Sequence, residues 1–147
     1  MGKQPLPASQ KESLLGETKR DPFFLVQHAE DPRFSFTLAG SEKIGEAEAR
    51  ILDVDADGAQ TRWWVDAQTG RILRTAARSV GMGGSGQQRV DYSDFRPVGG
   101  VVVPFKQTIS RDGRDAGTAE MKEIEVNPTV DPKLFEKPPM GGPAAPR

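Results

Sequence analysis

One stretch of the chain, residues 87–109, constrains the fold more than any other. It reads QQRVDYSDFRPVGGVVVPFKQTI, in which Pro97–Gly100 separates two β-prone runs. Polar and apolar residues alternate before this corner, as at Val90 and Tyr92, and the β-branched run Val101–Val103 follows it. This pattern on both sides of turn-forming residues predicts a β-hairpin. Pro104 cannot donate a backbone hydrogen bond, so we expect the second arm at a sheet edge or with a bulge.

Similar β-prone segments lie on both sides of this hairpin, and they predict about seven strands at regular spacing. The turns that we expect between them are Ala39–Ser41, Asp55–Gly58, Ala67–Gly70 and Arg111–Arg114, with a flexible loop at Gly81–Gln88 and a last strand at Ala116–Val126. The sequence contains no strand–helix–strand crossover pattern. It therefore predicts an α+β fold with a single antiparallel β-sheet, and a twisted sheet of this kind tends to curl.

The N-terminal part of the chain has helix signals instead. Ser9-Gln-Lys-Glu12 fits a capping box, and Asp21-Pro22 fits an N-cap followed by proline in the first turn. The apolar run Phe23–Val26 follows the second signal. We expect two short helices packed on the concave face of the sheet, and one further helical turn at Asp131–Phe135.

Composition bounds the domain and excludes several classes of partner. The 20 basic and 21 acidic residues are interspersed and give a net charge of −1, which does not favour nucleic-acid binding. There is no cysteine, so disulfides and thiolate metal sites are excluded. We predict disordered tails at residues 1–8 and 139–147. The second tail is rich in Pro, Gly and Ala. Residues 9–138 would then form a single domain.

No motif in the sequence predicts an active site. Asp53–Gly58 resembles the first half of a calcium loop, but its twelfth position is Trp64 instead of a bidentate glutamate. We interpret it as a solvated hairpin turn. His28 is the only histidine and lies at a predicted helix end, and Ser85 lies in a glycine-rich loop without the context of a nucleophile. We therefore predict no catalytic residues, no metal and no cofactor, and an enzyme is the least favoured class.

The aromatic residues leave two interpretations open. Trp63 and Trp64 are neighbours on a predicted strand, so their side chains lie on opposite faces of the sheet. Core packing explains the inner one, whereas the outer one needs another cover. The phenylalanines of the helices and strands either form an ordinary core or line an apolar cavity. An ordinary core and an apolar cavity both require the same alternation of apolar and polar residues along the strands.

Three motifs in order resemble a known family. They are Trp64–Gly70 (WVDAQTG) before a strand, Tyr92–Pro104 (YSDFRPVGGVVVP), and a closing segment that runs from Val126-Asn-Pro128 to Leu134-Phe-Glu-Lys-Pro138. Together they are similar to the C-terminal half of bacterial outer-membrane lipoprotein-sorting proteins, the lipoprotein carriers of the LolA/LolB type. The resemblance covers about residues 42–138 and rests on turns and strands, not on catalytic groups.

The resemblance implies a half-open β-barrel whose concave side is plugged by helices, with an apolar cavity for lipid acyl chains or another hydrophobic small molecule. It also implies a periplasmic or extracellular location, although this sequence contains no export signal. Family members usually have more strands ahead of the helices than this chain does. Similar modules occur at the end of larger secreted proteins, some with zinc-peptidase domains, but HExxH is absent here.

Two functional hypotheses follow. The first is a non-enzymatic module that binds a hydrophobic ligand between sheet and helices, in a concave and mostly apolar pocket. Its predicted lining is Phe23, Phe24, Val26, Phe34, Phe36, Leu38, Trp63 or Trp64, Val90, Tyr92 and Val102. A register slip of one residue would invert the choice on any strand. The alternative is a structural or docking domain of a larger secreted or periplasmic protein, with a filled core, no ligand of its own and other domains of the parent chain as partners.

Overall fold

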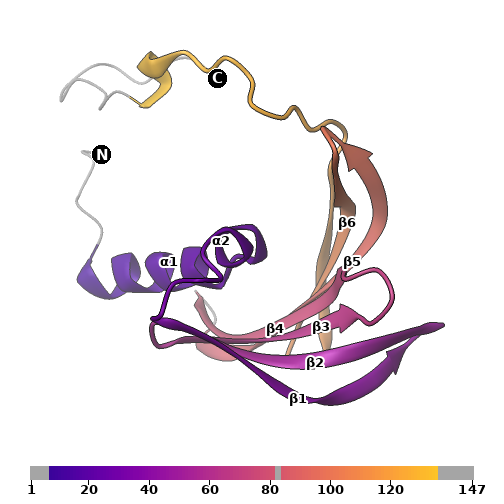
Figure 1. Ribbon diagram of the computed structural model, residues 1–147. Coiled ribbons are helices and arrows are strands. Elements are labelled where there is room, and N and C mark those ends of the chain that lie inside the picture. The colour runs from indigo at the N-terminus through magenta and orange to yellow at the C-terminus, as the bar shows by residue number, and fades with distance from the viewer. Residues whose placement is uncertain (1–6, 82–83, 136–147) are drawn as a thin grey trace.

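The computed structural model describes residues 7–81 and 84–135, which form one open antiparallel sheet with two helices (Figure 1). Each strand pairs with its neighbours in sequence, in the order β1 to β7. The strands are β1 (Phe34–Ile44), β2 (Ala47–Ala56), β3 (Ala59–Asp66), β4 (Ile72–Gly81), β5 (Gly84–Val98), β6 (Val101–Arg111) and β7 (Arg114–Glu120). Among the described residues β1 and β7 do not pair, so the sheet is not closed into a barrel. The predicted α+β architecture, a curved half-open sheet of about seven strands with helices, is confirmed.

The helices α1 (Ala8–Arg20) and α2 (Pro22–Gln27) lie on the concave side of the sheet, with α1 against β3 and β4 (Figure 1). Asp21 forms the predicted N-cap of α2, since its carboxylate accepts a 3.1 Å hydrogen bond from Phe24 N. A 3₁₀ turn, η1 (Pro132–Phe135), matches the predicted last helical turn. None of the helices in the described residues is long and apolar enough to cross a membrane.

The start of α1 differs from the prediction. Pro7 occupies the N-cap position, and its carbonyl accepts hydrogen bonds from Gln10 N and Lys11 N, both 3.0 Å. Because the helix already begins at Ala8, the capping box predicted at Ser9 is wrong. Of the two predicted tails, residues 1–6 and 139–147 lie outside the described part of the chain.

Most of the predicted turns are confirmed. In the β2–β3 turn, Asp57 and Gly58 have φ angles of 54° and 84°, the left-handed values that a tight hairpin requires. Asp55 stabilises this turn by accepting a 2.7 Å hydrogen bond from Gly58 N. Gly99 and Gly100 likewise have positive φ at the corner between β5 and β6.

Three local predictions are wrong. Ala39–Ser41 is not a turn, because β1 runs through it and absorbs Gly40 as a register shift. Gly84–Gln88 belongs to β5 and pairs with the end of β4, whereas residues 82–83 of the predicted loop lie outside the description. The last strand begins at Arg114 and ends at Glu120 instead of spanning Ala116–Val126. The edge position predicted for Pro104 is confirmed: β7 pairs with β6 only from Lys106 to Arg111, so Pro104 has a partner strand on one side, at Phe95 of β5.

The core lies between α2 and the concave face of β2 and β3. Leu25 is fully buried there and packs with Val54, Ala56, Ala59 and Trp63. Phe34, Leu52, Val65 and Ile72 surround this cluster and are half-buried. Leu25 therefore anchors α2 over β2 and β3.

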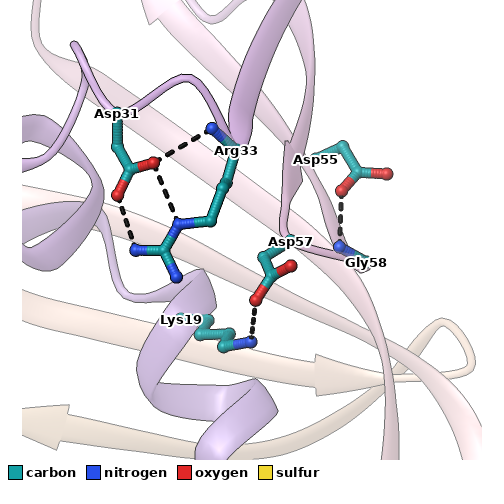
Figure 2. A network of polar contacts seen from close by, with 6 residues as sticks. All are labelled: Lys19, Asp31, Arg33, Asp55, Asp57 and Gly58. Atoms are coloured by element: carbon teal, nitrogen blue, oxygen red, sulfur yellow. Dashed lines mark hydrogen bonds and ion pairs between the residues drawn. The ribbon is translucent and has the colours of Figure 1, made fainter.

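A surface network attaches the helices to the β2–β3 turn (Figure 2). Lys19 of α1 pairs with Asp57 at 2.7 Å, and the backbone N–H of Asp57 donates to Arg33 O at 3.2 Å. Arg33 in turn donates two side-chain hydrogen bonds to Asp31, at 3.0 and 2.7 Å. The Arg33 guanidinium lowers the pKa of Asp31 to about 2, and Lys19 lowers the pKa of Asp57. These groups are solvent-exposed, so each pair contributes little to stability by itself.

Candidate functional site

The strand registers align one concave-face residue from each of six strands. Leu38 lies opposite Leu52, Leu52 opposite Trp63, Trp63 opposite Thr75, Thr75 opposite Val90, and Val90 opposite Ile109. We call these six residues the concave row. It is apolar toward both sheet edges, and its middle, at Thr75, is polar.

Toward β1 the concave row is open. Leu38 is 63% exposed and its neighbour Phe36, on the same face, is 37% exposed. Phe36 meets the ring of Trp63 edge-on, with 5.9 Å between ring centroids. We call Phe36, Leu38 and Leu52, together with Trp63 at their inner end, the apolar strip. The helices leave the outer part of this strip uncovered.

A cleft of about 330 Å³ lies where α1 meets α2, between these helices and the concave face of β3–β5. We call it the helix–sheet cleft. Its helical wall consists of Glu17, Arg20, Asp21 and Pro22, and its sheet wall of Thr61, Thr75, Ala77, Gln88, Val90 and Tyr92. The lining is thus a mixture of charged, hydroxyl, amide and apolar groups.

Hydroxyl groups dominate the sheet wall. Tyr92 Oη and Thr75 Oγ1 are 3.3 Å apart and share a hydrogen bond, and Thr61 Oγ1 donates to Ala76 O at 3.2 Å. Burial raises the pKa of Tyr92, against a smaller lowering by the hydrogen bond to Thr75, and the negative charge of Asp21 raises it further. The phenol therefore stays protonated at neutral pH and can donate a hydrogen bond.

Charged groups dominate the helical wall. Arg20 is half-buried and forms no ion pair with any described residue. Its Nη1 lies 3.5 Å from where a Cβ on Gly16 would be, so the guanidinium lies back along α1. Glu17 is exposed, and Asp21 uses one carboxylate oxygen to cap α2. The wall thus presents one cation between two anions.

The other predicted lining residues occupy several places. Phe24 stacks on His28, with 4.2 Å between ring centroids, and lies 6.1 Å from Phe34 at the edge of the core. Phe23 and Val26 are exposed on α2. Val90 and Tyr92 line the helix–sheet cleft, and Phe36, Leu38 and Trp63 belong to the apolar strip.

Trp64 lies on the convex face, opposite to Trp63. Its Nε1 donates a 2.8 Å hydrogen bond to Glu42 Oε2, and the Arg74 guanidinium lies 5.6 Å from its ring centroid. Arg74 is itself paired with Asp91 at 2.6 Å. Polar and charged side chains therefore cover the outer tryptophan, and it does not face the helices.

Val102 also lies on the convex face. It alternates with the buried residues Val103 and Phe105, whose side chains point to the concave side, and it is opposite Pro97 in β5. Neither Val102 nor Trp64 can reach a ligand held between sheet and helices.

The calcium-like segment acts as a turn. Asp53 pairs with Arg62 on the convex face, Asp55 caps the turn and Asp57 pairs with Lys19, so the three carboxylates do not converge. No cluster of His, Cys, Asp or Glu in the described residues has the size needed for a metal site.

Sequence reasoning missed the polar part of the cleft. Arg20, Thr61, Thr75 and Gln88 were not among the predicted residues, because a pocket for a hydrophobic ligand predicts apolar lining positions. A usable signal existed: Thr61 and Trp63 share one strand face, so Thr61 places a hydroxyl in phase with the core.

No protein-family model and no curated protein matches the chain. Three solved structures match it at low identity. An outer membrane lipoprotein-sorting protein domain from Vibrio parahaemolyticus is 11% identical over 65% of this chain and 45% of its own, with a TM-score of 0.44. A LolA superfamily protein from Nitrosomonas europaea is 14% identical over 73% of this chain and 50% of its own, with a TM-score of 0.47.

The third, a DUF1329 family protein from Desulfovibrio piger, is 13% identical over 74% of this chain and 47% of its own, with a TM-score of 0.49. This chain spans half or less of the length of each structure. Two of the names belong to the superfamily that the sequence motifs resemble. The likeness concerns the course of the chain, not a ligand or an activity.

Proposed function

We propose that this protein is a non-enzymatic, extracytoplasmic module that binds a hydrophobic ligand, a lipid or an acyl chain, on the concave side of its sheet. The observation that carries the proposal is the apolar strip. Leu38 and Phe36 face the concave side and remain 63% and 37% exposed, because the helices end short of them. Burial of apolar surface contributes about 25 cal/mol per Å² to the free energy of binding. An acyl chain that lies along the strip would therefore be bound mainly by the hydrophobic effect.

The open sheet suits this role for a geometric reason. A closed core would need the space over the strip for side chains, whereas here α2 fills only the part next to Leu25. The residue resemblance to lipoprotein carriers supports the same class of ligand and an extracytoplasmic location.

The test is titration with a fluorescent fatty-acid probe, with tryptophan emission followed in parallel. We expect saturable binding close to one probe per chain, and displacement by an unlabelled lipid. Leu38→Asp should weaken binding at least tenfold, which corresponds to about 1.4 kcal/mol, because it places a charge on the apolar strip.

Val102→Asp is the matched control, since Val102 is an exposed apolar strand residue on the convex face, 46% exposed against 63% for Leu38. It should bind the probe as the wild type does. Equal losses in both variants, or no saturable binding by a wild type whose fold is verified by circular dichroism, would contradict the proposal.

The second candidate is a docking domain of a larger secreted or periplasmic protein. Its supporting observation is the C-terminal segment, where Val126, Val130, Leu134 and Phe135 are 49%, 45%, 76% and 81% exposed. Such a series of exposed apolar side chains would suit contact with another domain. A folded protein that binds no probe would favour this candidate.

A further inference from the structure

The helix–sheet cleft differs from the apolar strip in the chemistry of its lining. Its volume of about 330 Å³ is near the lower end of the roughly 300–1,000 Å³ usual for small-molecule sites. Charged groups and hydroxyls line most of it. A cleft of this kind suits a compact polar group and not an acyl chain.

The charges in the cleft select among polar groups. The half-buried Arg20 guanidinium has no ion-pair partner among the described residues, so it can pair with an anionic oxygen. Tyr92 and Thr75 add hydroxyls on the opposite wall. Glu17 and Asp21, however, would repel a simple anion and attract an ammonium group. A ligand group that carries both a negative and a positive charge can pair with the Arg20 guanidinium and also with the carboxylates of Glu17 and Asp21.

We propose that the helix–sheet cleft binds a zwitterionic head group in which an ammonium is linked to a phosphate, with Arg20 and the Tyr92–Thr75 hydroxyls on the phosphate and Glu17 on the ammonium. This inference rests on the proposed function, since it assigns the head group of the same ligand whose chain lies on the apolar strip.

The concave row supports this arrangement. Going from β1 to β4 it passes through Leu38, Leu52 and Trp63 and then reaches Thr75, the first polar position and a wall of the cleft. With strands about 4.8 Å apart, Leu38 and Thr75 are separated by about 14 Å across the sheet. The sequence of positions, apolar and then polar, matches the order of chain and head group in a single-chain lipid. Trp63 itself is 4% exposed and packs with Leu25, so a chain that joins the strip to the cleft passes beside this ring and not over it.

The test compares amphiphiles with one common acyl chain and different head groups. Lysophosphatidylethanolamine, lysophosphatidylglycerol and the monoacylglycerol would each displace the fluorescent probe, below their micelle concentrations. We expect the zwitterion to bind at least tenfold tighter than the other two. Glycerophosphoethanolamine has the same head group but lacks the acyl chain, so it distinguishes a lipid from a free head group. We expect calorimetry to detect its binding and to show that it is much weaker than the binding of the lipid.

Substitutions then locate the preference. Arg20→Gln should reduce the affinity for both phospholipids at least fivefold and leave that for the monoacylglycerol unchanged. Glu17→Gln should remove the preference of the zwitterion over the anionic phospholipid. Arg62→Gln is the control, because Arg62 is an arginine on the convex face. Thermal unfolding of each variant checks the fold.

The outcomes separate the two proposals. Equal affinity for all three lipids, or a preference for the anionic one, would overturn the head-group assignment and leave the carrier function intact. If none of the three lipids binds, both the head-group assignment and the carrier function are overturned. A loss of phospholipid affinity in Arg62→Gln but not in Arg20→Gln would also overturn the assignment of the cleft.

Discussion

The concave side of the sheet has two regions that face the same pair of helices and are built differently. Beneath α2, Leu25 interdigitates with Val54, Ala56 and Trp63 and leaves no room. Beneath the end of α1, the equivalent sheet positions carry Thr61 and hydroxyl neighbours, and a cleft remains. Anchoring of the helices and space for a ligand are thus divided between neighbouring strand positions. A change in one region should therefore leave the other function largely intact.

Breaking the packed region should have the largest effect. Leu25→Ala removes the most buried side chain of α2, and we expect a loss of about 3 kcal/mol in the free energy of unfolding, within the range of buried leucine truncations. Urea unfolding followed by tryptophan emission measures it. Val26→Ala on the same helix is 62% exposed and should cost less than about 0.5 kcal/mol. Similar costs for both would mean that α2 is not anchored by Leu25.

Asp21 belongs to both regions, since it caps α2 and lines the cleft. Asp21→Ala should destabilise the protein by about 1 kcal/mol through loss of the hydrogen bond from Phe24 N. Asp21→Asn keeps a capping side chain and should retain most of the stability while removing the charge from the cleft. The two variants, compared by thermal unfolding and by lipid binding, separate the structural from the electrostatic role. An equally large loss of stability in Asp21→Asn would be evidence against simple capping.

The smallest effect concerns the polar network that attaches α1 to the β2–β3 turn. The pKa values of Asp31 and Asp57 are lowered, to about 2 for Asp31, so their contribution to stability is complete above the ordinary value of 3.8. It is lost as the pH falls from about 4 to about 2. Urea midpoints should decrease over this interval, and less so in a Lys19→Gln, Arg33→Gln double variant. Parallel decreases in both proteins would assign the acid sensitivity to other carboxylates.

Local pattern predicted most of the fold. Strands followed from period-two alternation and turns from pairs such as Asp57-Gly58 and Gly99-Gly100, because both signals act over a few residues. The Gly40 turn failed for a physical reason: a glycine supplies an irregular φ to a bulge as readily as to a turn, here 145°. The edge position of Pro104 was predictable because a residue without a backbone N–H cannot donate to a ladder, and β7 indeed pairs with β6 only from Lys106 onward.

The site was predictable only in part. Alternation placed Trp63 and Trp64 on opposite faces but could not tell which of them faces the helices, since that depends on the contact of Leu25 with the sheet. The same limit put Val102 among the lining candidates. The cleft itself arises where two sequence-distant segments meet, at Arg20 and Tyr92, and no local pattern marks such a meeting.

The pairing of every strand with its immediate neighbours in sequence has a consequence for how the chain reaches its native state. Such a meander can assemble by adding one hairpin at a time, each closing a short loop, so its contact order is low for a β-rich protein. The N-terminal helices are then available before the first hairpin forms, and they can dock as soon as β2 and β3 provide a surface. Strand order in space thus repeats the order of synthesis.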